Sequence, residues 1–101
     1  MINFLNIRQH FHEYHTDKSP WAYYYCIEVK DKPEVRQYIT VPFWAYEYCY
    51  IIKDRPEVYK YITSSLYAYR YCITVKDRPS VRQYITEEKH LKNYQDWKNK
   101  Q

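Results

Sequence analysis

The feature that most constrains this chain is a 23-residue sequence repeat. Residues 21–40, 44–63 and 67–86 align at that offset without gaps, and 11 of 20 positions are the same in all three copies. Copies one and three agree at 15 of the 20 positions. Shared composition does not produce such agreement, so the chain is expected to use one structural unit three times.

Each copy opens with apolar residues at helical spacing. In the first copy Ala22, Tyr25, Cys26 and Val29 stand at i, i+3, i+4 and i+7, which is the stripe that an amphipathic helix buries. The other two copies carry the same stripe, with small residues between large ones. We therefore expect a longer helix at the start of each copy, packed closely against its neighbours.

A Lys-Asp-Lys/Arg-Pro turn follows the stripe, and its proline blocks simple continuation of the helix. Two starts are open for a second helix: Asp31 as the N-cap, or residue 32 as the cap with Pro33 at the first helical position. Proline's restriction of the preceding residue favours the second. The second helix is expected to run for about eight residues and to bury a second stripe. In the first copy this stripe is Val35, Tyr38 and Ile39.

A helical hairpin this small cannot bury its own apolar stripe, so the copies are expected to stack. We predict an all-α fold, a short α-solenoid of three helix-turn-helix repeats forming a single domain over residues 1–101. Its expected parts are an N-terminal cap (1–18), the repeats (19–40, 41–63 and 64–86) and a C-terminal capping helix (87–101). In the last of these, Leu91 and Tyr94 occupy the places of Ala68 and Tyr71.

The motif A-Y-x-Y-C-x-x-V-K-D-R-P-E-V, read from Ala22, Ala45 and Ala68, resembles short tandem αα-hairpin repeats of uncharacterised bacterial and bacteriophage proteins, written A-Y-x-Y-A-x-x-V-I-K-x-R-x-P-E. The resemblance covers about residues 19–86. Cys and Asp stand here where most of those repeats have Ala and an extra Gly or Trp near the turn. The resemblance implies a helical repeat and a phage or mobile-element context. It transfers no activity and no functional residue.

Composition excludes several functional classes. The chain has no glycine, which argues against phosphate-cradling loops and nucleotide-binding enzymes. It has no apolar run of about 18 residues, and its first 15 residues are too polar for a secretory signal, so we expect a cytoplasmic protein without a membrane partner. For a phage-encoded protein this is the host cytoplasm. Three cysteines without an export signal favour reduced thiols.

No residue set points to catalysis, a metal or a cofactor. Cys26, Cys49 and Cys72 recur every 23 residues without any C-x-x-C, and free cysteine most often fills a core as a small hydrophobe. In His10-x-His12-x-x-His15 only two rings share a helical face, so a solvated surface is favoured over a weak metal site. We expect no enzyme activity, no cofactor and no small-molecule substrate.

Recognition in repeat proteins generally uses outward positions that differ between copies. The sequence predicts a protein or ribonucleoprotein partner, bound by an adaptor or an inhibitor, of which an anti-CRISPR-like protein is one form if the phage resemblance holds. Exposed aromatic and arginine residues are typical anchors of such interfaces. The predicted protein-binding residues are Tyr24, Glu47, Tyr50, Ile51, Tyr59 and Arg70.

The alternative is a nucleic-acid-binding helical repeat. It would use a basic edge at the turns and a row of half-exposed tyrosines as stacking platforms. The edge consists of Lys30, Lys32, Lys53, Arg55, Lys76 and Arg78, and the row of Tyr23, Tyr46 and Tyr69. The net charge of +4 is modest, and Asp31, Asp54 and Asp77 at the same turns cancel half of the edge charge. A solvated edge is therefore the simpler interpretation.

Overall fold

The computed structural model describes residues 17–101, and this part of the chain is all helical. Its longer helices are α2 (Ser19–Glu28), α4 (Pro42–Ile51), α6 (Ser65–Thr74) and α8 (Glu88–Asn99). One-turn helices lie between them: α3 (Pro33–Arg36), α5 (Pro56–Tyr59) and α7 (Pro79–Arg82). His10, His12, His15 and the predicted cap up to residue 16 lie outside the described residues. None of the described helices combines the length and apolarity needed to cross a bilayer.

The turn between each longer helix and its short helix settles the capping question. Lys32, Arg55 and Arg78 are the N-cap residues, with extended backbone angles near φ −116° and ψ 140° in the first case, and a proline occupies the first turn of each short helix. Asp31 is therefore not the cap, as the restriction before proline predicts. The short helices span four residues rather than about eight. Beyond Arg36 the chain tightens into i→i+3 bonds, with Tyr38 N donating to Val35 O at 3.1 Å.

The longer helices end without glycine. Every described residue has a negative φ. The amides of Val29 and Lys30 both donate to the carbonyl of Tyr25, at 2.8 and 3.1 Å, and the same pair of bonds closes α4 on Tyr48 and α6 on Tyr71. A widened last turn thus satisfies the terminal carbonyl that a left-handed glycine would otherwise help to satisfy.

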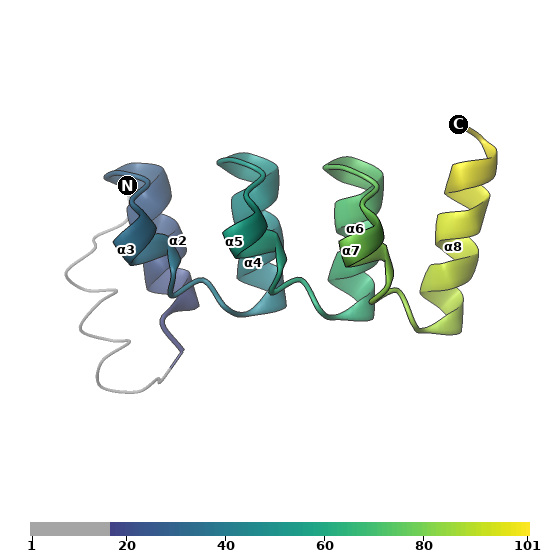
Figure 1. The fold of residues 1–101 in the computed structure, drawn as a ribbon, viewed down its shortest axis with the longest axis horizontal. Helices are drawn as coiled ribbons and strands as arrows, with labels where there is room; N and C mark the ends of the chain where they lie inside the picture. Colours follow the sequence, from purple (N-terminus) through teal and green to yellow (C-terminus); the bar gives the residue numbers. More distant parts are fainter. Residues whose placement is uncertain (1–16) are drawn as a thin grey trace.

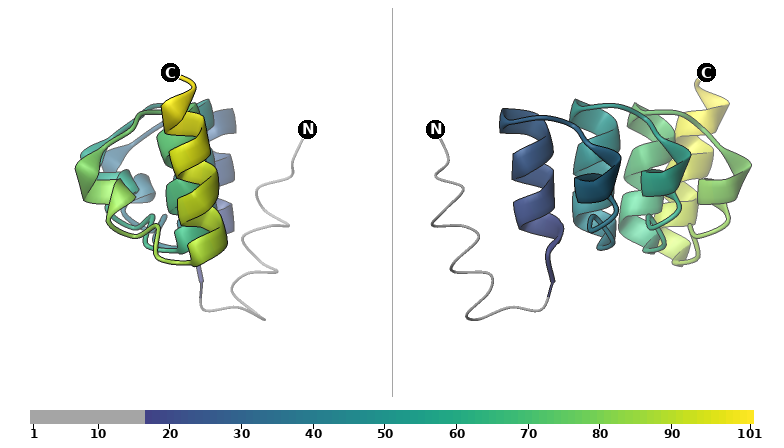
Figure 2. Two further views of the ribbon diagram at one scale, coloured as in Figure 1. Left: turned by 90° about the vertical axis from the view of Figure 1, so that its right-hand side faces the viewer. Right: turned by 60° about the vertical axis from the view of Figure 1, so that its left-hand side comes forward.

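The longer helices stand side by side in chain order, and the short helices lie together on one side of that row (Figure 1). Contacts join α2 to α4, α4 to α6 and α6 to α8, while each short helix contacts the longer helix before it. The view along the row in Figure 2 shows the longer helices nearly superposed and the short helices displaced to one side. Since equivalent positions recur every 23 residues, they stand at the same height on neighbouring helices.

Small side chains allow this close packing. Ala22, Ala45 and Ala68 are fully buried, and the cysteine one turn later in each copy is at most 5% exposed. The short helices and the turns after them add valines and isoleucines to the same core, namely Val35, Ile39, Val58, Ile62, Val81 and Ile85. The predicted core of each copy is confirmed at these positions.

Three predicted core positions are wrong. Val29 is 56% exposed, whereas its equivalents Ile52 and Val75 are partly buried against the core. Tyr38 is 40% exposed because the chain has already left the short helix there. Leu91 is 40% exposed although its equivalent Ala68 is fully buried. Among the described residues no further helix follows α8 to cover that side.

A serine at the first position of α2 and α6 joins each helix to the start of the next longer one. The Ser19 hydroxyl accepts the amides of Thr40 and Val41, at 2.9 and 3.2 Å. The Ser65 hydroxyl does the same for Thr86 and Glu87, at 3.1 and 3.0 Å. These bonds fix the spacing between longer helices near their N-terminal ends.

Candidate protein-interaction surface

The longer helices expose the side that faces away from the short helices. On α4 the buried residues are Ala45, Tyr46, Tyr48 and Cys49, so the opposite side carries positions 43, 47, 50 and 51. The equivalent positions on α2 and α6 face the same way. We call this surface the outer face; it consists of Pro20, Tyr24, Ile27, Glu28, Phe43, Glu47, Tyr50, Ile51, Leu66, Arg70, Ile73 and Thr74.

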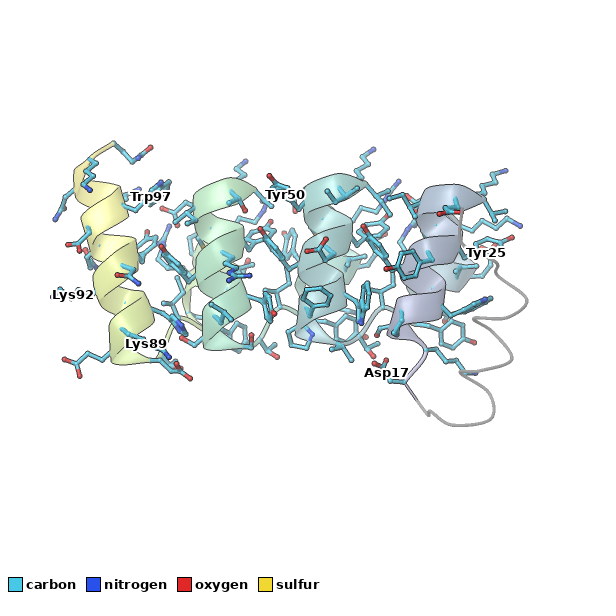
Figure 3. The ribbon with its side chains drawn as sticks, turned by 180° about the vertical axis from the view of Figure 1, so that it is seen from behind. Asp17, Tyr25, Tyr50, Lys89, Lys92 and Trp97 are labelled. Carbon is cyan, nitrogen blue, oxygen red and sulfur yellow. The ribbon has the colours of Figure 1, made fainter. Side chains whose placement is uncertain are left out.

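Five of the six predicted protein-binding residues lie on the outer face. Tyr50 and Ile51 are 52% and 50% exposed, and Arg70 is exposed as well. Tyr24 and Glu47 are half-buried. Figure 3 looks onto this side of the row and labels Tyr50 near the C-terminal end of its helix. Tyr50, Ile51 and Arg70 are thus exposed, whereas Tyr24 and Glu47 reach the surface only in part.

Aromatic rings support the exposed residues from beneath. The Tyr50 ring lies 5.8 Å from that of buried Tyr46, and the Phe43 ring lies 4.8 Å from Trp44 and 5.5 Å from Tyr67. Such edge-on and tilted packing holds rings in defined positions. The outer face is therefore a largely preformed surface, which lowers the entropic cost of binding.

Tyr59, the sixth predicted residue, does not lie with the others. It belongs to α5, on the opposite side of the row, and is half-buried. The Arg78 guanidinium stands 4.8 Å above its ring, and the Tyr71 ring is 5.8 Å away. These contacts connect the second and third copies, so Tyr59 has a packing role.

The row of half-exposed tyrosines predicted for base stacking is wrong in two of three places. Tyr23 and Tyr46 are only 6% and 8% exposed, because the next longer helix covers them. Tyr69 is half-buried, and its ring stacks on that of His90 at 6.1 Å with 8° between the planes. The position that flanks the stripe therefore lies at the contact between adjacent helices.

The predicted basic edge divides into two kinds of residue. Lys30, Lys53 and Lys76 are exposed. Lys32 stands 5.8 Å above the Tyr25 ring. Arg55 and Arg78 are half-buried and paired with carboxylates of the preceding copy. The edge therefore offers fewer free cations than the sequence suggested.

The two arginines belong to a bridge that joins consecutive copies. The Tyr71 hydroxyl donates to the Asp54 carboxylate at 2.6 Å and accepts from Arg78 Nε at 2.7 Å. A second Arg78 nitrogen donates to the other Asp54 oxygen at 2.7 Å. We call this arrangement the Asp–Tyr–Arg bridge. Because Tyr71 is fully buried, the bridge closes the core between α4 and α6.

The full bridge recurs at one further junction, and the third junction keeps the aspartate and the tyrosine without the equivalent arginine. Between the first and second copies Tyr48 donates to Asp31 at 2.7 Å and accepts from Arg55 at 2.8 Å. Arg36, 5% exposed, adds a bond to each of Asp31 and Tyr48. At the last junction, between α6 and α8, the acceptor is Asp77, and Gln101 stands where the other two junctions have an arginine. There Tyr94 and Lys98 of α8 both donate to Asp77, at 2.8 and 3.0 Å.

The bridges shift the acidity of their members. Burial alone would raise the pKa of Asp31, but the hydrogen bonds from Tyr48 and Arg36 and the nearby arginine charges lower it below its usual value. The pKa of Asp77 is lowered in the same way, by Arg82, Tyr94 and Lys98 against the effect of burial. Burial and the bond to the carboxylate raise the pKa of Tyr48 and Tyr71 well above the usual value. These pKa shifts favour the carboxylate at Asp31 and Asp77 and the neutral phenol at Tyr48 and Tyr71.

Sequence reasoning missed the bridge. The tyrosine and the aspartate are the same in all three copies, so the sequence contained a sign of the bridge. That sign was a constant spacing between residues of different copies. The tyrosine follows the aspartate by 17 residues, and the arginine follows the tyrosine by seven. Within a single copy, the tyrosine is interpreted as a core residue, and the aspartate and arginine are interpreted as parts of a solvated turn.

The three cysteines are buried free thiols, as predicted. Burial raises the pKa of Cys26 and Cys72 to about 11 and that of Cys49 to about 12. A thiol with a raised pKa is a poor nucleophile and a poor metal ligand. Among residues 17–101 no cluster of three histidine, cysteine or acidic side chains is placed to hold a metal ion.

No protein-family model, curated protein sequence or solved structure matches the chain.

Proposed function

We propose that this chain is a non-catalytic, protein-binding α-solenoid of three repeats, closed by capping helices, that acts as an adaptor or an inhibitor by occupying the surface of a larger macromolecule. The observation that carries the proposal is the outer face. In the middle copy this face presents Tyr50 and Ile51, each about half exposed. The Tyr50 ring packs on the ring of buried Tyr46. Exposed aromatic residues fixed in position are typical of the centres of interfaces.

Charge at the border of this centre supports the same role. Glu47 lies one turn before Tyr50 and Ile51, and Arg70 lies at the equivalent position on α6. The ion pairs formed within residues 17–101 include neither of them. An apolar centre with unpaired charges around it combines affinity with specificity. With the resemblance to bacteriophage repeats, an anti-defence inhibitor of the anti-CRISPR kind in the host cytoplasm is one concrete form of this proposal.

The test is affinity capture from the native host with the whole chain as bait, with and without nuclease. Tyr50→Ala is the informative variant, because its side chain is exposed and its removal leaves the core intact. Tyr38→Ala is the matched control, an exposed tyrosine on the opposite side. We expect a nuclease-resistant partner whose affinity falls by about 2 kcal/mol in Tyr50→Ala and by less than about 1 kcal/mol in Tyr38→Ala. Equal losses in both variants, or none in either, would contradict the outer-face site.

A nucleic-acid role remains the second candidate because Lys30, Lys53 and Lys76 are exposed along one edge. Three phosphate contacts give a weak interaction with a shallow salt dependence. Replacing these three lysines with alanine leaves the Asp–Tyr–Arg bridges intact and isolates the edge. Tight RNA or DNA binding at about 200 mM salt that this triple variant abolishes would favour the second candidate.

A further inference from the structure

The outer face carries opposite charges at equivalent positions on neighbouring helices. Position 47 on α4 is Glu47, and the same position on α6 is Arg70. Asp17 precedes α2 at the start of the row, and Lys89 lies in the first turn of α8 at its end; Figure 3 shows both at the same end of their helices. On α4 and α6 the acidic residue thus lies toward α2 and the basic residue toward α8, while the equivalent side of α8 carries both Lys89 and Asp96.

This distribution matches itself after rotation by half a turn. A two-fold axis parallel to the longer helices, between α4 and α6, places α4 of one copy on α6 of another. Because equivalent residues stand at the same height, Glu47 then meets Arg70 of the second protein molecule. Arg70 likewise meets Glu47 of that molecule. A two-fold interface makes each of these contacts twice.

The apolar residues agree with the same pairing. Phe43 meets Leu66 of the second molecule, and Tyr50 meets Ile73, so the exposed side chain near the C-terminal end of α4 gains an apolar partner. Rotation about the axis that runs along the row would instead place Glu47 on Glu47 and Arg70 on Arg70. Like charges in direct contact oppose association. The charges therefore select the first arrangement over the second.

We infer that, before a larger partner binds, the outer face of one molecule covers that of a second molecule of this chain in a two-fold dimer, with α4 packed on α6 of the other molecule. This inference rests on the proposed role of the outer face as a protein-binding surface. The ion pairs within residues 17–101 include neither Glu47 nor Arg70; the Arg70 guanidinium lies 5.6 Å from the centroid of the Tyr67 ring, so a carboxylate of a second molecule would be its ion-pair partner.

Sedimentation of the full chain over a range of concentrations, with reductant present, tests the dimer. We expect a monomer–dimer equilibrium. Glu47→Arg and Arg70→Glu each set like charges against each other twice, and should each raise the dissociation constant about tenfold or more. An equimolar mixture of the two variants restores both opposite-charge contacts and should return to wild-type association. Glu34→Arg on α3 and Lys92→Glu on the side of α8 that points away from α6 are matched charge reversals that lie off the outer face. Both should leave the monomer–dimer equilibrium unchanged.

Each outcome decides a separate point. Wild-type protein that stays monomeric, single variants that still dimerise, or a mixture that does not recover would each overturn the dimer. If a foreign protein is nevertheless captured in a Tyr50-dependent manner, the proposed function stands without the dimer. If the mixture recovers and no foreign protein is captured, the dimer stands and the adaptor or inhibitor role fails.

Discussion

Tyr71→Phe is the sharpest test of what holds consecutive copies together. The substitution keeps the ring and removes one oxygen that donates to Asp54 at 2.6 Å and accepts from Arg78 at 2.7 Å. The side chain is fully buried, so no water replaces the lost group without rearrangement. Hydrogen bonds to charged partners contribute about 1.5 to 3 kcal/mol, and we expect a loss of about 2 kcal/mol. For a domain of this size that is roughly 8 to 16 °C in the melting midpoint.

The measurement is urea and thermal denaturation followed by circular dichroism. Tyr50→Phe is the control, because that exposed hydroxyl has no hydrogen-bond partner among the described residues, and we expect a change below about 0.5 kcal/mol. A double-mutant cycle with Asp54→Asn should give a coupling energy of about 1 kcal/mol or more. If Tyr71→Phe unfolds at the wild-type midpoint, or if the coupling energy is near zero, the bridge does not contribute to stability and the argument fails.

Two further predictions concern buried titratable groups. All three cysteines should react slowly with a thiol reagent in the folded protein and quickly in urea, and rapid labelling of the folded protein would refute their burial. Cys49→Asp should prevent folding, whereas Cys49→Ala should lower the free energy of unfolding by only about 1 kcal/mol. Acid should destabilise the protein through Asp31 and Asp77. Their folded pKa values lie below the unfolded value of about 3.9, so their contribution is complete above about pH 5 and is lost as the pH falls through the folded values. The urea midpoint should fall over this range, and Asp31→Asn should flatten the fall; a midpoint that is constant from pH 6 to pH 3 would contradict it.

The sequence by itself determined the helices, their order and much of their packing. The 3.6-residue period placed Ala45 and Cys49 in the core, and proline at position 33 indicated a new helix and favoured residue 32 as its cap. These features depend on residues close together in the chain. Backbone geometry and helical periodicity therefore decide them without reference to the rest of the fold.

The tertiary structure decided which polar side chains meet. Asp54 and Arg78 lie on consecutive turns 24 residues apart, and only the rotation and spacing of one copy against the next bring both onto the Tyr71 hydroxyl. The same relation buries Tyr46 and leaves Tyr50 on the outer face, although both belong to one helix. A repeat period predicts that the junctions are similar. The orientation of neighbouring units depends on the packing of their side chains, which is a property of the assembled row and is not encoded in any one copy.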